Sequence, residues 1–288
     1  MKNNPLIKIL VALLFAAAPL GASAAEGDAQ RGQYLAQAGG CVGCHTEQKK
    51  DAVPFAGGRA LKTPFGTFYG PNITPDPEAG IGKWTQAEFM RAMRHGERPD
   101  GANYFPAFPY PSFTRISDAD LRDLWAYLRG LAPSKQTSRE HALSFPYSWR
   151  PLVSAWKWLY FTPGDGADAP PTAASVQRGA YLVNALGHCG ECHTPRNALG
   201  GPNKARTLAG GKGPNDKRMP NLTPTRLKKW SDAELKDFLL SGATPDGDAA
   251  DEMMDEVIRN TTSRLTPTDL AAVIAFLRSL APLEDEPR

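Results

Sequence analysis

The chain has 288 residues, of which 41% are hydrophobic and 22% charged, and its formal net charge is +3. This hydrophobic content excludes disorder as the default class, and the length allows two domains with a core in each. Its 33 basic and 30 acidic residues nearly balance, so we expect no nucleic acid among its partners.

The N-terminus predicts a secretory signal peptide over residues 1–24. Lys2 and Lys8 supply the basic start, residues 9–18 the short apolar stretch, and residues 22–24 the cleavage pattern Ala-Ser-Ala. A membrane anchor is the competing interpretation, but this apolar stretch is far shorter than the roughly 20 residues of a spanning helix. No later segment is long enough either. We therefore expect a periplasmic protein with no transmembrane segment after cleavage, held to the inner membrane at most through a partner.

Two copies of the motif C-x-x-C-H follow, and they contain all four cysteines of the chain. Two cysteines on one helical turn can each form a thioether with a haem vinyl group, and the next residue can present its imidazole to the iron. The motifs therefore predict two covalently attached haem c groups, each with one iron. The predicted cofactor-binding residues are Cys41, Cys44, Cys189 and Cys192, and the predicted proximal iron ligands are His45 and His193.

Other interpretations of paired cysteines fit the sequence less well. A zinc site would need two pairs close enough to complete one tetrahedron, and these pairs lie far apart along the chain. A thioredoxin-like dithiol needs no histidine after its second cysteine, and it would lie in a βαβ unit. Structural disulfides would leave both histidines as coincidences.

The two halves of the chain match each other segment by segment. The run Arg31-Gly-x-Tyr-Leu precedes the first haem motif, and it recurs at Arg178 before the second. The run Pro71-Asn-Ile-Thr-Pro recurs, with Leu for Ile, at Pro220. Helix starts recur as well, with predicted N-caps at Thr85 and Ser231, and at Ser117 and Thr266. These matches predict a mostly α fold of two tandem cytochrome c domains, each wrapped round one covalent haem.

We place the first domain at residues 25–133, a linker at 134–175 and the second domain at 176–288. The linker carries a group of aromatic residues: Phe145, Tyr147, Trp149, Trp156, Trp158, Tyr160 and Phe161. One interpretation is a helix whose aromatic side chains pack across the domain interface. The other is a surface on which a partner subunit docks.

A methionine usually completes an electron-transfer haem c on the distal side of the iron. Met219, Met253 and Met254 follow the second haem motif. We prefer Met254 as the distal ligand, because the chain should cross the distal face between the Asp-Gly turn and the closing helix; filling of the core is the alternative. A backbone carbonyl near Pro195 could orient the imidazole of His193.

The first domain has no methionine in the corresponding stretch. Its distal candidates are Met90, Met93 and His95, and an open, five-coordinate iron is a further possibility. Met93 fits a core position equally well, and His95 fits an exposed helix end. The loops at Asn72 and Asn221 are expected to edge the haem crevice, where their amides would either meet the propionates or form ordinary turns.

With these residues in view, the chain resembles the two-haem cytochrome c subunits that accompany periplasmic molybdenum hydroxylases and alcohol or aldehyde dehydrogenases. Besides the repeated runs, the motifs that carry this resemblance are Thr63-Pro-Phe-Gly, Gly80-Ile-Gly-x-Trp, Pro106-Ala-Phe-Pro-Tyr-Pro, His188-Cys-Gly-Glu-Cys-His-Thr-Pro-Arg-Asn and Met254-x-x-Val-x-x-Asn-Thr. Some relatives have methionine where this chain has Phe108, so that ligand does not carry over. Three-haem relatives have a third haem domain and a C-terminal membrane helix, and this sequence shows neither.

The resemblance implies an electron-transfer subunit with no catalytic residues of its own. Its implied partners are the catalytic subunit of a dehydrogenase and a terminal electron acceptor, either quinone or another cytochrome. The alternative is an enzyme, either a two-haem peroxidase or a thiosulfate-oxidising cytochrome, in which the first iron is open. A weaker alternative is a module that senses a small gas at that iron.

Overall fold

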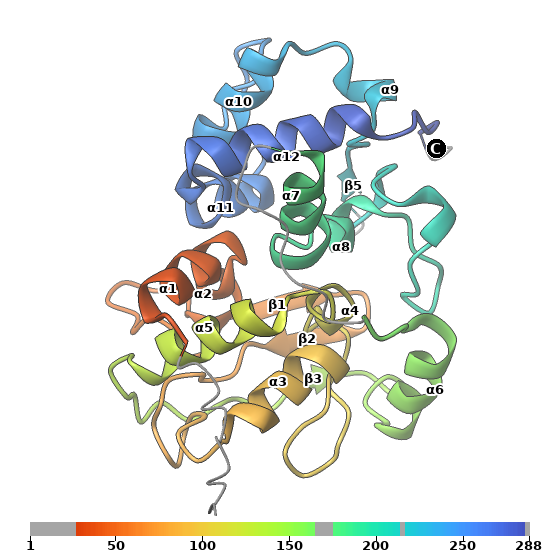
Figure 1. The fold of residues 1–288 in the computed structure, drawn as a ribbon. Helices are drawn as coiled ribbons and strands as arrows, with labels where there is room; N and C mark the ends of the chain where they lie inside the picture. The colour runs from red at the N-terminus through yellow and green to blue at the C-terminus, as the bar shows by residue number, and fades with distance from the viewer. Residues whose placement is uncertain (1–26, 165–174, 214–216, 286–288) are drawn as a thin grey trace, which may run out of the picture.

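The computed structural model describes residues 27–164, 175–213 and 217–285. The predicted signal peptide lies outside these residues. The first domain contains the helices α1 (Ala29–Ala38), α2 (Cys41–His45), α3 (Gln86–His95), α4 (Tyr110–Phe113) and α5 (Asp118–Arg129). The second contains α7 (Val176–Tyr181), a π-helical turn η1 (Leu182–Leu186), α8 (Gly190–His193), η2 (Lys204–Arg206), α9 (Pro224–Leu227), α10 (Asp232–Ser241), α11 (Glu252–Asn260), η4 (Thr262–Arg264) and α12 (Pro267–Ser279). Figure 1 shows the two helical domains stacked one above the other, as the repeat predicts.

Short strands, which the sequence analysis does not predict, accompany the helices. β1 (Ala60–Thr63), β2 (Gly66–Tyr69) and β3 (Ala142–Leu143) form an antiparallel sheet in the order β1-β2-β3. In the second domain, β4 (Gly211–Lys212) pairs with β5 (Arg218–Met219). Because β3 comes from the linker, this sheet fixes the start of the linker to the first domain.

The predicted helix caps are confirmed. Thr85 and Glu88 form a capping box at the start of α3, and Ser231 and Glu234 form the same box on α10. The side chains of Ser117 and Thr266 accept hydrogen bonds from the third residue of α5 and α12. Local side-chain chemistry therefore sets the start of the same two helices in each domain.

In each domain the first helix crosses the last at a glycine. A Cβ atom on Gly32 of α1 would lie 1.9 Å from the carbonyl oxygen of Asp123 on α5, and one on Gly179 of α7 would lie 1.9 Å from that of Ala272 on α12. No side chain fits at that distance. The glycine of the repeated Arg-Gly-x-Tyr-Leu run is therefore required by helix packing.

Replacement of Gly32 by alanine is expected to destabilise the protein by about 3 kcal/mol, because the helices must separate to admit the methyl group. Gly130→Ala is the control, since Gly130 has φ of −86° and its added Cβ would lie no closer than 3.4 Å to another atom. Its effect should stay within about 0.5 kcal/mol. Denaturant unfolding measures both, and equal losses would contradict the packing argument.

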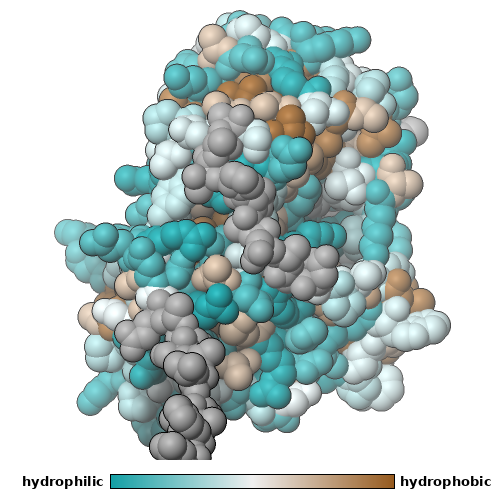
Figure 2. All heavy atoms as spheres, in the orientation of Figure 1, coloured by the Kyte–Doolittle hydropathy of each residue, from teal (hydrophilic) through white to brown (hydrophobic). Residues whose placement is uncertain are grey.

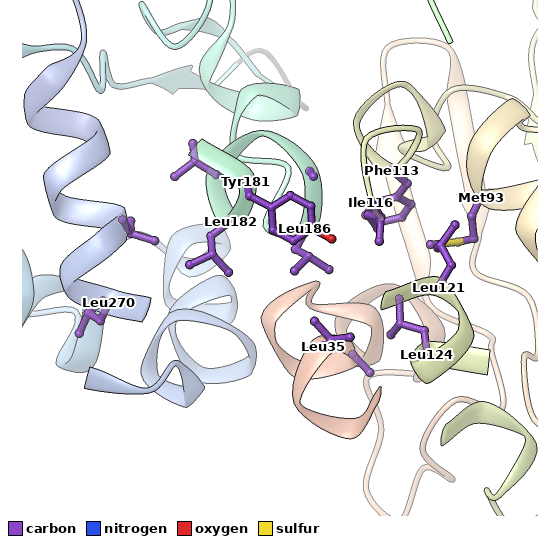
Figure 3. Packing of buried hydrophobic residues seen from close by; sticks show 14 of the residues in the cluster. Leu35, Met93, Phe113, Ile116, Leu121, Leu124, Tyr181, Leu182, Leu186 and Leu270 are labelled. Carbon is purple, nitrogen blue, oxygen red and sulfur yellow. The ribbon is translucent and has the colours of Figure 1, made fainter. Parts of the chain in front are cut away.

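The two domains share one hydrophobic core. Leu35 on α1 and Leu121 on α5 belong to the same buried cluster as Tyr181 and Leu186 of the second domain. Figure 3 shows the side chains of Tyr181 and Leu186 pointing towards the first domain. The surface face drawn in Figure 2 is mostly hydrophilic, with hydrophobic residues in separate groups. The domains are therefore joined by core packing as well as by the linker.

The linker helix α6 (Pro151–Tyr160) contacts both domains. Trp156 donates a hydrogen bond to the carbonyl of Leu199 at 3.0 Å, and Lys157 donates one to the carbonyl of His95 at 2.7 Å. The ring of Phe161, just after α6, packs against Tyr110 of the first domain, with 5.1 Å between ring centroids, so two aromatic residues of the linker contact different domains. Trp158 is 84% exposed, so docking of a partner on the outer side of α6 stays a prediction.

The π-helical turn η1 has a cause in the sequence. Arg178 and Cys189 are one residue further apart than Arg31 and Cys41. A single inserted residue within a helix is accommodated as one wide turn, and Leu182–Leu186 takes that form. The extra residue is thereby taken up before the second haem motif begins.

Candidate haem sites

Each C-x-x-C-H motif forms a short helix after the first helix of its domain. Cys41 and His45 are the ends of α2, and Cys189 is the N-cap of α8, which ends at His193. The residue before the first cysteine is left-handed in both domains, with φ of 62° at Gly40 and 40° at His188. Each motif therefore follows a left-handed residue, and its two cysteines and histidine lie within one short helix and its N-cap.

No disulfide joins any of the four cysteines. Burial raises the pKa of Cys41 to about 12, with a smaller contribution from Cys44. Burial also raises the pKa of Cys189 to about 12. A thioredoxin-like dithiol needs a lowered pKa to form its nucleophilic thiolate. These thiols are therefore unlike a redox dithiol, and no structural disulfide accounts for the motifs.

Both histidines are held by the same type of hydrogen bond. The Nδ1 of His45 lies 2.8 Å from the carbonyl oxygen of Pro71, and the Nδ1 of His193 lies 2.8 Å from that of Pro220. A carbonyl can only accept, so Nδ1 carries the proton and Nε2 keeps its lone pair. Burial lowers the pKa of both imidazoles, and the carbonyl bonds only partly oppose this shift. Both rings are neutral near pH 7 and fit to ligate a metal.

This arrangement corrects the prediction for the second domain. The carbonyl of Pro195, next to the haem motif, accepts a hydrogen bond from the backbone of Asn203. The orienting carbonyl comes instead from Pro220, the first residue of the repeated Pro-Asn-x-Thr-Pro run. Because Pro71 does the same for His45, the device is present in both domains. The recurrence of that run was the signal that could have revealed it.

The two asparagines of these runs form turns, in which their side-chain oxygens accept from the N–H groups of Thr74 and Thr223. The amide nitrogen of Asn72 donates to the carbonyls of Ser134 and Gln136, both at 2.8 Å. That of Asn221 donates to the carbonyl of Leu283 at 2.7 Å. With both amides used to tie down the segment after the closing helix, the propionate prediction is wrong and the turn prediction is right.

The distal segments of the two domains have the same backbone register. After α3, the N–H of Tyr104 bonds the carbonyl of Gly96 at 2.8 Å, and after α10 the N–H of Ala250 bonds the carbonyl of Gly242 at 2.8 Å. Gly96 and Gly242 are the C-caps of those helices, both left-handed. Residues between these points therefore correspond one to one, and beyond them the second domain enters α11 at Glu252 whereas the first forms a turn before α4.

The methionines of the second domain have different surroundings. Met254 lies on the first turn of α11 and packs against the core, whereas Met219 lies on β5, where its side chain fills the space beside Gly213. Since Met219 directly precedes Pro220, whose carbonyl holds the proximal His193, it lies on the proximal side. Met254 as distal ligand stays a prediction. Met253 and Met254 are both half-buried, but only Met254 is among the residues packed against the core.

The distal candidates of the first domain lie on or beside α3. Met93 is 7% exposed and belongs to the hydrophobic core, among Ile116 and Leu121 (Figure 3). Met90 packs against the edge of that core. His95 is the last residue of α3, and its backbone carbonyl binds the linker helix. The structure therefore brings none of them to the segment that corresponds to Met254.

A tyrosine of each domain also donates a hydrogen bond to an aspartate of the other domain. The hydroxyl of Tyr34 on α1 donates to Asp269 on α12 at 2.6 Å, and that of Tyr181 on α7 donates to Asp120 on α5 at 2.5 Å. Within its own domain Arg178 holds Asp269 at 2.7 Å, and Arg31 holds Asp120 in the same way. Sequence reasoning noted the repeated Arg-Gly-x-Tyr run but missed this exchange.

Each haem motif lies close to the other domain, at the same interface. Ser112 on α4 donates a 2.6 Å hydrogen bond to Glu191 between the cysteines of the second motif. Glu256 on α11 binds Arg59 at 2.7 Å beside the first motif. The pKa of Cys44 is raised mainly by burial, then by Glu256, and also by Cys192. The two motifs are therefore near neighbours.

Comparison with known proteins decides the family. The sequence profile of the family Cytochrome c matches residues 29–132 and again 176–281. The chain belongs to the cytochrome c family. It carries two covalently bound haem c groups with iron, as the two motifs predict. Donors fit that cofactor in both domains, since each site offers two half-buried cysteines without a disulfide and a neutral imidazole whose Nδ1 is bonded to a carbonyl, so that Nε2 keeps its lone pair.

Three relatives cover most of the cytochrome. It is 43% identical to "Diheme cytochrome c-type" of Cereibacter sphaeroides, over 90% of this chain and 88% of the relative. It is 40% identical to "Alcohol dehydrogenase (quinone), cytochrome c subunit" of Gluconacetobacter polyoxogenes, over 88% of this chain and 56% of the relative. It is also 39% identical to "Fructose dehydrogenase cytochrome subunit" of Gluconobacter japonicus, over 91% of this chain and 54% of the relative.

The cytochrome has a buried ion pair, and the loss of this pair in acid should make the fold less stable. Burial raises the pKa of Asp269, but hydrogen bonds from Arg178 and Tyr34 more than offset this, and the net pKa lies below its ordinary value. A carboxylate whose pKa is lowered in the folded state contributes its full stabilisation of the fold above its unfolded pKa of about 3.9. This contribution is lost as the pH falls through the folded pKa.

Asp269→Asn should therefore lower the free energy of unfolding at pH 7 by about 3 kcal/mol, because Arg178 is left buried without its counter-charge. Unfolding of the variant should also depend less on pH below about 4. Asp232→Asn is the control, since Asp232 is 72% exposed in its pair with Arg278; it should cost less than about 1 kcal/mol. Equal losses in the two variants would contradict this account.

Proposed function

We propose that this cytochrome is a periplasmic electron carrier. It takes electrons from the catalytic subunit of a dehydrogenase and passes them to a terminal acceptor, quinone or another cytochrome. The observation that carries the proposal is the packing of two equivalent C-x-x-C-H motifs on one domain interface, where Ser112 binds Glu191 and Arg59 binds Glu256. Such neighbours suit transfer between two cofactors. The names of two relatives, which are cytochrome subunits of dehydrogenases, agree with it.

The protein's contribution is to hold and orient the cofactors, which supply one-electron redox chemistry when bound. We assign the thioether positions to Cys41, Cys44, Cys189 and Cys192, and the proximal ligands to His45 and His193. The carbonyls of Pro71 and Pro220 fix the tautomer and the orientation of the two imidazoles. Met254 would ligate the iron of the second haem.

The periplasmic location is part of this proposal. It is supported by the sequence of residues 1–24 and by the chemistry of covalent haem attachment. Across the residues that the structure describes, none of the helices combines the length and the apolar character needed to cross a membrane. We expect the mature protein in the periplasmic fraction to begin at Ala25. An intact Met1 on the haem-loaded protein would contradict the assignment.

A turnover assay separates the carrier from the competing enzyme, a peroxidase or a thiosulfate-oxidising cytochrome. The haem-loaded protein is reduced, freed of reductant, and mixed with a soluble quinone analogue, with an oxidised small cytochrome c, with hydrogen peroxide or, when oxidised, with thiosulfate. A carrier gives up one electron per haem to the quinone or the cytochrome c and then stops. Sustained turnover of peroxide or thiosulfate would overturn the proposal.

A further inference from the structure

We propose that the two haem sites differ on their distal side. Met254 ligates the second iron. Phe108 packs beside the first iron without ligating it, so this iron stays open to small neutral ligands such as carbon monoxide. This inference rests on the haem assignments of the proposed function. It adds a ligand-binding position that a carrier with two equivalent haems would lack.

The distal segments of the two domains can be aligned by their backbone hydrogen bonds. Phe108 lies four residues after Tyr104, and Met254 lies four residues after Ala250. Tyr104 and Ala250 are the residues whose N–H groups bond the C-cap glycines of α3 and α10, each at 2.8 Å. The antiparallel bridges between Glu97 and Asn103, and between Ala243 and Ala249, are equivalent too. Counted from this shared register, Phe108 stands at the place in the first distal segment where the second has Met254, although Met254 lies on α11 and Phe108 in a turn before α4.

The surroundings of Phe108 are aromatic. Its ring packs against Tyr104, with 5.3 Å between ring centroids, against Phe113 at 5.8 Å and against Tyr110 at 6.4 Å. Phe108 is half-buried and also contacts the hydrophobic core. A phenyl ring has no lone pair for iron, and this aromatic group holds it in place. The surroundings of the position therefore favour covering the site over ligating it.

Met93 is the strongest rival ligand. It lies eight residues after the N-cap of α3, and Leu239 lies eight residues after the N-cap of α10. Both side chains are buried in the core, with exposures of 7% and 8%. The second domain places leucine there and still has Met254 for its iron. Met93 therefore fills a core position that hydrocarbon fills equally well.

The other two candidates fail by the same correspondence. Met90 occupies the position of Lys236, and His95 that of Ser241, counted from the same helix caps. Lys236 and Ser241 are exposed. The second domain therefore has no methionine or histidine at either position, and in the first domain Met90 packs against the edge of the core. This removes Met90, Met93 and His95, the three candidates that the sequence offered, as ligands of the first iron.

Two consequences follow for the first haem. Methionine on the distal side raises the reduction potential of a haem c, so the first haem should have the lower potential of the two. A ferrous iron with a free sixth position binds carbon monoxide, whereas an iron ligated by His193 and Met254 resists it. The difference between the sites therefore has both an electrochemical and a ligand-binding signature.

The test is a carbon monoxide titration of the reduced, full-length holoprotein, with total haem measured separately. The wild type should bind carbon monoxide at one of its two haems, and the ferric protein should show one high-spin iron. Phe108→Met should abolish that binding and raise the lower of the two potentials. Met93→Leu, the control for the rival ligand, should bind as the wild type does.

Each other result counts against the inference. If neither haem of the wild type binds carbon monoxide and Met93→Leu opens one, Met93 is the ligand. If neither wild-type nor Met93→Leu protein binds it, the first iron has some other ligand, and the inference also fails. In both cases two haems per chain would leave the proposed function intact. Finding a single haem per chain would overturn the proposed function itself. The wild-type titration decides the question by itself, so the inference can be refuted even if Phe108→Met folds poorly.

Discussion

Replacing Cys189 and Cys192 together by alanine should leave a protein with one covalent haem instead of two. Both thioether bonds of the second site are lost, while Cys41 and Cys44 in the first domain keep theirs. Haem content by pyridine haemochrome and the intact mass of the denatured chain measure the result. The expected loss is half of the covalent haem, which makes this the largest effect that we predict.

The matched control changes a residue between the cysteines. Glu191→Gln removes the charge that binds Arg196 and keeps a side-chain oxygen to accept from Ser112, but leaves both thiols, so it should keep two haems. The yield of the double alanine variant should fall, because the second motif packs beside the shared core. Two covalent haems in that variant would contradict the assignment of the motif.

Met254→Leu should lower the potential of the higher-potential haem and make its ferrous form bind carbon monoxide. The reason is the loss of the thioether, the distal ligand that raises the potential of a haem c. Leucine has a similar volume, so the fold should lose less than about 1.5 kcal/mol. A potentiometric titration followed by haem absorbance, with a carbon monoxide titration of the same sample, measures both effects.

Met253→Leu provides the comparison for that variant. Met253 precedes Met254 on the first turn of α11 but is not among the residues that pack against the core. Its replacement should leave both potentials and the carbon monoxide stoichiometry as in the wild type. If Met253→Leu produced the change and Met254→Leu did not, the distal ligand would be the neighbouring methionine.

Much of this architecture could be predicted because its signals are local in the sequence. A C-x-x-C-H motif contains its own geometry within one turn, and the capping boxes at Thr85 and Ser231 lie within four residues. The repeat then doubles each signal, since a match between halves indicates the same local structure twice. The helical fold and the tandem arrangement follow from such short-range patterns.

Interactions between distant residues could not be read in the same way. The carbonyl that holds His193 belongs to Pro220, 27 residues further along, and no local pattern joins them. The exchange of Tyr34 and Tyr181 between domains depends on how the two domains pack. A repeat shows that two domains resemble each other, but it does not show which residues of one domain bind the other.

The most direct test of the central claim is a spectroelectrochemical titration of the full holoprotein with its two haems. The account predicts two reversible one-electron steps that together account for all of the haem absorbance, with the lower step belonging to the haem at His45 and the higher to the haem at His193. Disappearance of the higher step in Met254→Leu assigns it. A single step carrying half of the absorbance, or two steps that Met254→Leu leaves unchanged, would contradict the account.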